Sequence, residues 1–288
     1  MHRITLGQFE LSILSDGRYL ADGGAMFGVV PKVLWERKIP ADSRNRIEMG
    51  LNSLLIRDGT HTVLVETGIG PKLSEKARRI YDHEPQLLRS LAEAQVAPDE
   101  VDIVINTHLH FDHCGWNTHF HRGRAVPTFP RARYYVQRGE WEHAHHPNER
   151  DRVSYIGDNY DPLEESGQLE LISGDREILP GIAVRVYPGH TRDLQTVVIG
   201  SGGRTACYPS DLIPTAHHLD IAWVMGYDSF PVETMEQKKR FYAEAIPQHW
   251  LLVFTHDRAL PLAYVEAGVD GKYVARSAAG QPVLQRSA

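Results

Sequence analysis

The amino-acid sequence contains 16 histidines, and several of them lie beside an acidic residue in one short segment. Within six positions, directly after a predicted apolar strand, stand four side chains that bind metal ions: His108, His110, Asp112 and His113. Residues two apart point the same way only in extended chain, so we expect His108, His110 and Asp112 to converge from a strand end. His113 then faces a second centre after the chain turns at Cys114-Gly115. The spacing therefore indicates two metal ions rather than one.

Three more side chains of the same kind each follow a predicted strand further along the chain. His190, Asp211 and His256 stand in the segments 188–191, 209–211 and 254–257. Loops at strand ends are where α/β folds build their sites. A single histidine is more often a surface or core residue, but together with the first four these residues complete a dinuclear site. The histidines at 119, 121, 143, 145, 146, 217 and 218 are expected to bind no metal, because seven ligands already fill both centres.

A site of two divalent ions, five neutral histidines and two carboxylates has a net positive charge. Such a site stabilises the negative charge that develops on a substrate during a reaction. Such a pair of ions lowers the pKa of a shared water, orients the bridging hydroxide and stabilises the oxyanion formed at an attacked ester. A serine or cysteine nucleophile is then unnecessary. Asp112, beside that hydroxide, is expected to pass a proton to the leaving alkoxide. Zinc suits these ligands best, and manganese, iron and cobalt are the alternatives.

The elements that must position these residues predict one mixed α/β domain over residues 1–288. Turn residues between apolar runs predict two hairpins, 4–6 with 9–14 and 51–56 with 62–65. Helical spacing predicts a helix over 85–96, and a capping box from Thr234 to Gln237 predicts the start of a helix that runs to Ile246. Segments 147–175 and 212–233 are expected to be irregular. The remaining predicted elements are a helix over 139–146 and strands over 101–105, 133–137, 182–187, 196–199, 205–208 and 250–255.

The His-x-His-x-Asp-His run, followed in order by His190, Asp211 and His256, resembles the metallo-β-lactamase superfamily of metallohydrolases. Nearly the whole chain is also similar to the YtnP-type quorum-quenching lactonases. This second resemblance rests on residues 22–32 with Leu34-Trp35, the run 107–113, residues 211–215 with Trp223-Val224, and Tyr227-Asp228 with Pro231. The metal motif is specific for the superfamily, whereas the stretch 26–32 marks the subgroup without proving its substrate.

The resemblance implies a four-layer αββα sandwich with the site at one edge. It also implies how seven ligands are shared by two ions: His108, His110 and His190 on one, Asp112, His113 and His256 on the other, and Asp211 bridging them.

Two positions depart from the family pattern. Glu66 replaces an aspartate that commonly orients a ligand histidine from behind, and glutamate is longer by one methylene. Pro214 stands three residues after Asp211, where several lactonases carry a tyrosine, and Tyr227 is the expected substitute.

The leading hypothesis is a dinuclear metal-dependent hydrolase that opens lactones, foremost N-acyl-homoserine lactones. Its expected catalytic residues are Asp112, Asp211 and Tyr227, and its expected substrate-binding residues are Phe27, Trp116 and Trp223. An apolar wall of this kind suits an acyl chain, although ordinary core is the alternative for these aromatic side chains. A phosphotriesterase or aryl esterase is the alternative enzyme, because the same hydroxide attacks phosphorus. A metal-binding protein without catalytic activity is the alternative from another functional class. The presence of ligand residues at all seven positions disfavours this alternative.

Composition narrows the partners. The net charge of −6 disfavours nucleic-acid binding, and no apolar window is long enough to span a membrane. The N-terminal residues show no signal peptide, and the two cysteines, Cys114 and Cys207, are too few for a disulfide framework. We therefore expect a cytoplasmic enzyme with a small lactone or ester as substrate, and a homodimer as the assembly to test.

Overall fold

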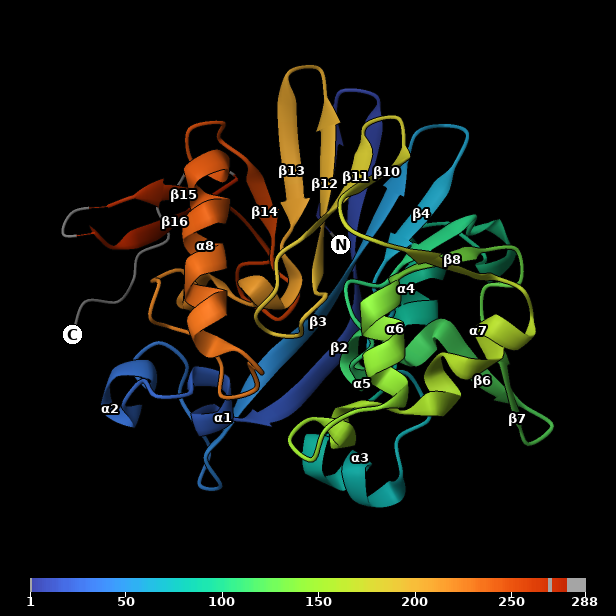
Figure 1. Ribbon diagram of the computed structural model, residues 1–288, viewed down its shortest axis with the longest axis horizontal. Helices are drawn as coiled ribbons and strands as arrows, with labels where there is room; N and C mark the ends of the chain where they lie inside the picture. Colours follow the sequence, from blue (N-terminus) through green and yellow to red (C-terminus); the bar gives the residue numbers. More distant parts are fainter. Residues whose placement is uncertain (1, 269–270, 279–288) are drawn as a thin grey trace.

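The computed structural model describes residues 2–268 and 271–278, and in it two sheets of seven strands pack against each other (Figure 1). In spatial order the first sheet consists of β1 (His2–Leu6), β2 (Phe9–Asp22), β3 (Arg46–Arg57), β4 (Thr62–Val65), β5 (Ile103–Ile105), β8 (Arg133–Gln137) and β9 (Leu169–Ile172). The second consists of β10 (Arg176–Leu179), β11 (Ile182–Val186), β12 (Gln195–Ser201), β13 (Arg204–Tyr208), β14 (Leu251–Val253), β15 (Leu262–Ala267) and β16 (Tyr273–Ser277). A small hairpin joins β6 (Thr118–His121) to β7 (Arg124–Pro127).

In each sheet, neighbouring strands that run parallel are connected by a segment that contains a helix. The strands β1 to β4 form antiparallel pairs, whereas β4, β5, β8 and β9 are parallel. In the second sheet only the β13–β14 pair is parallel in the described chain. Parallel neighbours need a crossover, and the residues between β13 and β14 supply one that contains α8 (Pro231–Ala245). The ends of β5, β13 and β14 therefore open toward long connecting segments.

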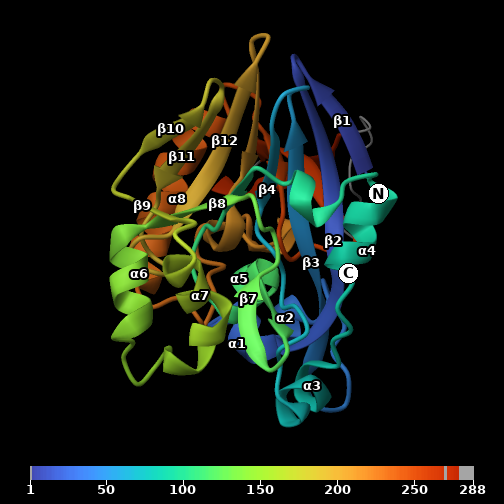
Figure 2. The same cartoon turned by 90° about the vertical axis from the view of Figure 1, so that its right-hand side faces the viewer.

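The core lies between the sheets, and helices cover their outer faces. Phe9, Leu54 and Ile105 of the first sheet belong to one buried cluster with Val197 and Tyr208 of the second. On the outside of the first sheet pack α4 (Leu87–Glu93), α6 (Arg138–His145) and α7 (Asp161–Glu165), and on the outside of the second packs α8. Figure 1 shows α8 on one side of the molecule and the other three helices on the opposite side, and Figure 2 gives the perpendicular view. The predicted αββα sandwich is thus confirmed.

Four further α-helices lie near the ends of strands. They are α1 (Gly23–Phe27), α2 (Lys32–Trp35), α3 (Glu75–Tyr81) and α5 (Phe111–Cys114). Asp22 caps α1, since its carboxylate accepts a hydrogen bond from Ala25 N at 2.8 Å. No helix in the described residues has the length and apolar character needed to cross a bilayer.

Both predicted hairpins and the strand over 133–137 are confirmed, and two other predictions need correction. Helix α8 starts at Pro231 rather than at a Thr234 cap, because proline at the first helical position already has the required φ. The Thr234 hydroxyl lies inside the helix and donates to Phe230 O at 3.4 Å. The segment 147–175 is not wholly irregular, since it contains α7 and the edge strand β9, which pairs with β8.

Candidate metal centre

The seven predicted ligands lie together at one edge of the sandwich, because each follows the end of a strand. His108 and His110 come after β5, His190 after β11, Asp211 after β13 and His256 after β14. All seven side chains are buried except that of Asp112, which is 14% exposed. Ligand atoms of the seven form three overlapping groups in which every atom lies within 4.8 Å of the others.

The chain after β5 stays extended only as far as His110. His110 has φ −63° and ψ 150°, and the helix α5 begins at the next residue. The prediction that Asp112 points with His108 and His110 from an extended chain is therefore wrong. Asp112 instead lies in the first turn of α5 and is grouped with His113 and His256. The turn is close to its neighbours: a Cβ on Gly115 would lie 1.8 Å from Ile69 O, so only glycine fits there.

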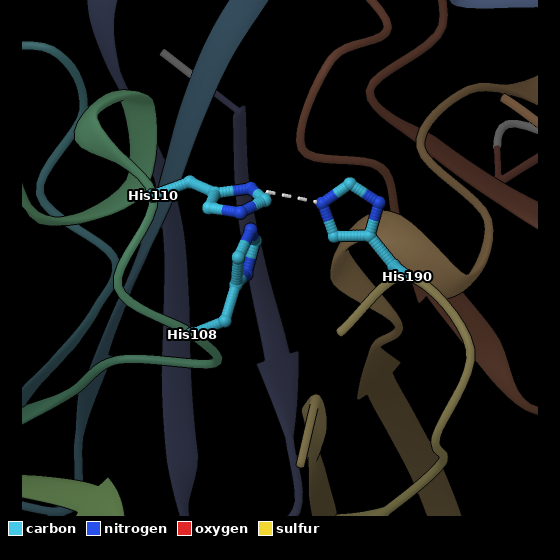
Figure 3. Close-up of side chains that lie close together, drawn as sticks. All are labelled: His108, His110 and His190. Atoms are coloured by element: carbon cyan, nitrogen blue, oxygen red, sulfur yellow. Dashed lines mark hydrogen bonds between the residues drawn. The ribbon is translucent and has the colours of Figure 1, made fainter. Parts of the chain in front are cut away.

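The first group consists of His108, His110 and His190 (Figure 3). His110 Nδ1 and His190 Nε2 lie 3.1 Å apart. On its far side, His190 Nδ1 lies 3.0 Å from Asp228 Oδ1, and His108 Nδ1 lies 3.0 Å from Thr107 Oγ1. A carboxylate only accepts hydrogen bonds, so Nδ1 of His190 carries the proton and Nε2 keeps a lone pair toward its neighbours.

The second group consists of Asp112, His113 and His256. Asp112 Oδ2 lies 3.7 Å from Nε2 of each histidine. The far nitrogen of each ring again lies beside an oxygen: His113 Nδ1 is 2.6 Å from Glu66 Oε2 in an ion-pair contact, and His256 Nδ1 is hydrogen-bonded to Gly50 O at 2.9 Å. These contacts fix both rings with Nε2 directed at the same point.

Asp211 stands between the two groups. Its Oδ2 lies 3.3 Å from His190 Nε2 and 3.5 Å from His113 Nε2, and its Oδ1 lies 3.3 Å from His256 Nε2. One carboxylate thus touches both sets of histidines, as a bridging ligand must.

The donor set fits two divalent metal ions. His108 Nε2, His113 Nε2 and Asp211 Oδ1 are buried and have no hydrogen-bond partner in the described chain. Buried polar atoms are rarely left unpaired, whereas metal ligands show this pattern of one free atom and one oriented by a neighbour.

Electrostatics act in two directions on the histidines of the site, because burial favours neutral rings and the nearby carboxylates favour protonated ones. Burial lowers the pKa of His108 and His110 well below the usual range, so both rings are neutral. For Asp211, burial opposes ionisation, but His113 and His256 outweigh it and hold the pKa well below its usual value. Burial likewise opposes protonation of His190, and Asp211 with Asp228 nevertheless raises its pKa.

Two buried carboxylates orient the ligands. Glu66, singled out from the sequence as a departure, accepts from Thr107 N at 2.6 Å with one oxygen and lies against His113 with the other. Asp228, which orients His190, was not identified as functional from its sequence position. The one sequence feature that could have identified Asp228 is its position beside Tyr227, in the segment that resembles lactonases.

A cavity of about 240 Å³ opens over the metal centre. Its floor contains five of the predicted ligands: His110, Asp112, His190, Asp211 and His256. Its apolar wall consists of Tyr19, Met26, Tyr81, Phe111, Met225 and Tyr227. The lining is completed by Gly226 and by Arg150, Asp151, Val153 and Ser154 from the segment after α6. The site therefore combines a polar floor with one largely apolar side.

The three predicted substrate residues are not brought to this cavity. Phe27 is fully buried in a stack with Trp35 and His218, and Trp223 meets the edge of that stack. The Trp116 indole donates to Asp16 Oδ1 at 2.8 Å and belongs to another surface. The neighbours Met26 and Met225 do line the cavity, whereas the rings of Phe27 and Trp223 pack in the core.

Tyrosines line the cavity in place of the phenol missing at Pro214. Tyr227 does so with 42% of its surface exposed. Tyr19, from the end of β2, was not predicted, and its hydroxyl donates to Asp112 Oδ2 at 3.4 Å. Burial and the nearby Asp112 raise the pKa of Tyr19 well above its usual value, so it remains a proton-bearing phenol.

Comparisons with known proteins agree with this geometry. The sequence model of the metallo-beta-lactamase superfamily matches residues 47–256. The crystal structure of a probable metal-dependent hydrolase from Staphylococcus aureus has a TM-score of 0.86 and 32% identity, over 95% of this chain and 99% of that one. AidC, described as a dizinc quorum-quenching lactonase in complex with a product, shares the fold with a TM-score of 0.77 and 22% identity over 96% of each chain.

Curated relatives match over a shorter length. An N-acyl homoserine lactonase from a Bacillus species is 29% identical over 153 residues, which are 53% of this chain. The match spans about half the length of that relative, 50%.

Proposed function

The chain belongs to the metallo-β-lactamase superfamily of metal-dependent hydrolases, and from this membership we propose that it is a dinuclear lactonase that opens N-acyl-homoserine lactones. One observation carries the proposal: two groups of ligands both contact Asp211 on the floor of a cavity with an apolar side. Such a cavity suits a polar ring ester with an acyl tail. The names of the curated relatives, N-acyl homoserine lactonases, support the same substrate.

The seven side chains would hold two divalent ions. His108, His110 and His190 would hold one ion, and Asp112, His113 and His256 would hold the other. Asp211 contacts both groups. Zinc is the expected metal because the ligands are histidines and carboxylates, and manganese, iron and cobalt are alternatives. When bound, the ions supply an activated water and a charge that stabilises the oxyanion of the attacked ester.

The residues of the chain itself then move the proton. Water adds to the carbonyl carbon, the ring C–O bond breaks, and the leaving alkoxide takes up a proton to give a hydroxy acid. Asp112 lies on the cavity floor with one oxygen 3.4 Å from the Tyr19 hydroxyl, so it is placed to receive the proton of the water and return it to the alkoxide. Tyr227 on the wall is the second phenol that can donate to the substrate. Asp211 holds both groups of histidines in register.

The cavity wall is proposed to bind the acyl chain. Met26, Phe111 and Met225 present apolar surface beside the floor, and their side chains adapt to tails of different shape. A volume of about 240 Å³ is small for a bound ligand, so the ring and a short chain fill it. A longer tail must continue past Val153, which is 78% exposed.

The test is a hydrolysis panel on one metal-loaded preparation whose metal content is measured. We expect about two ions per chain, and kcat/KM for acyl-lactones at least ~10-fold above that for phosphotriesters, or about 1.4 kcal/mol in transition-state binding. A preference for phosphotriesters or aryl esters, or no opening of lactones, would make the alternative enzyme the better account. Two bound ions without turnover of any ester in the panel would instead indicate a metal-binding protein without catalysis.

A further inference from the structure

We propose that Arg150 determines substrate specificity by donating hydrogen bonds to the amide carbonyl of an acylamino lactone. This inference rests on the proposed lactonase function and goes beyond it, because it assigns recognition of one substrate group to one residue. Arg150 lines the cavity above the metal centre, and it is the one lysine or arginine among the described residues that do so.

Arg150 stands on a segment whose backbone is held in place. Its backbone N–H donates to Asn148 Oδ1 at 2.8 Å, and the Asn148 amide donates to Asp151 Oδ2 at 3.1 Å. The same Asp151 oxygen lies 2.7 Å from His143 Nε2 of α6. Tyr155, further along, forms a backbone bridge to His110. The segment is thus tied to a helix on one side and to the metal centre on the other.

The guanidinium group of this exposed residue is held beside the cavity by two hydrogen bonds. Its Nη2 donates to Gly226 O and, at 3.0 Å, to Asp228 O. Gly226 is anchored in turn, because its N–H donates to Ala25 O at 2.8 Å. The carboxylate of Asp228 is turned away toward His190. Arg150 therefore joins two segments that both line the cavity, 150–154 and 225–227.

This arrangement leaves donors free. A guanidinium group has five N–H bonds in one plane, and two of them belong to Nη2. No residue in the described chain accepts a hydrogen bond from Nε or Nη1, although the side chain borders the cavity. A rigid group with unused donors beside an ester-binding floor suits a neutral carbonyl acceptor, and the acylamino group of the proposed substrates carries one next to the ring.

The experiment compares two lactones that differ in the amide. N-hexanoyl-homoserine lactone has the acceptor, and a γ-alkyl lactone of similar length has the same ring ester without it. In Arg150→Met we expect kcat/KM for the amide-bearing lactone to fall at least ~10-fold more than that for the γ-alkyl lactone, which corresponds to about 1.4 kcal/mol. Arg152→Met, an exposed arginine two residues away that does not line the cavity, is the matched control and should change neither.

Each other outcome decides a different point. Equal losses for both lactones in Arg150→Met, or none, would overturn recognition by Arg150, and equal losses would mean that it only joins the walls. Thermal unfolding and metal content of each variant show whether the fold is intact, and Arg150→Lys, which keeps the charge, should retain part of the discrimination if the inference holds. Wild-type enzyme that opens the γ-alkyl lactone but not the amide-bearing one overturns the inference and the proposed N-acyl-homoserine lactone substrate, and leaves a lactonase of another substrate class standing. Failure to open either lactone overturns the proposed function itself.

Discussion

Replacing Glu66 by glutamine tests whether the buried carboxylate behind His113 prepares that ring to bind metal. Glu66 is 2% exposed, and its two oxygens contact Thr107 N and His113 Nδ1, both at 2.6 Å. Glutamine has nearly the same shape and can still accept from Thr107 with its oxygen. The amide nitrogen of glutamine then faces Nδ1 of His113, so two N–H donors lie opposite each other. The negative charge of the carboxylate is also lost.

The expected effect is a weaker metal site in a folded protein. Removing a residue that orients a metal ligand typically lowers metal affinity 10–100-fold, which is about 1.4–2.8 kcal/mol. We therefore expect Glu66→Gln to bind the ion at Asp112, His113 and His256 roughly 10–100-fold more weakly.

The assay is competition with a chromophoric chelator, together with elemental analysis. Glu140→Gln is a matched control, because Glu140 is equally buried and accepts from Leu109 N at 2.9 Å and from the Tyr155 hydroxyl at 3.0 Å, without touching a ligand ring. Its metal affinity should stay within about 3-fold of wild type. Wild-type affinity in Glu66→Gln, or the same loss in both variants, would refute the role given to Glu66.

Three further outcomes are expected. His110→Ala should remove about one ion per chain and Asp211→Asn should weaken both, as elemental analysis will show; wild-type metal content and turnover in either variant would contradict the assignment. Tyr19→Phe should lower kcat for lactones at least ~10-fold at unchanged metal content, with a smaller effect in Tyr227→Phe, and the reverse order would make Tyr227 the more important phenol. Burial lowers the pKa of His218 to about 3. Between pH 6.5 and 3 the imidazole of this residue is therefore protonated in the unfolded chain but not in the folded one. The free energy of unfolding then decreases as the pH is lowered through that window, by up to about 1.4 kcal/mol per pH unit. Chemical denaturation should therefore show the destabilisation caused by His218→Gln shrink by about 1 kcal/mol or more between pH 6.5 and 5, and a constant difference would exclude a neutral buried ring.

Helix and strand positions illustrate where local pattern is sufficient. The hairpins at Gly7-Gln8 and Asp58-Gly59 were predicted because turn residues and alternation lie within a few positions of each other. The start of α8 was misplaced by one turn, since Pro231 sets the backbone before the capping box is reached. The edge strand β9 was missed because its four residues are strand only through pairing with β8.

The sequence by itself determined the kinds of metal ligand and their places at strand ends. Histidine and aspartate at 108, 110, 112 and 113 are chemically specific, and alternating apolar runs predict the strands that carry them and the later ligands to one edge. These features are local, so no knowledge of distant contacts was needed.

Only the tertiary structure decided what surrounds the ligands. Tyr19 and Asp112 are 93 positions apart and Arg150 and Asp228 are 78 apart, yet each pair is in hydrogen-bond contact. Conversely, Trp223 lies close in sequence to Tyr227 but packs against the core instead of the cavity. Periodicity indicates that a side chain is buried, whereas the packing of whole elements determines whether it faces core or cavity, and that depends on residues far away in the chain.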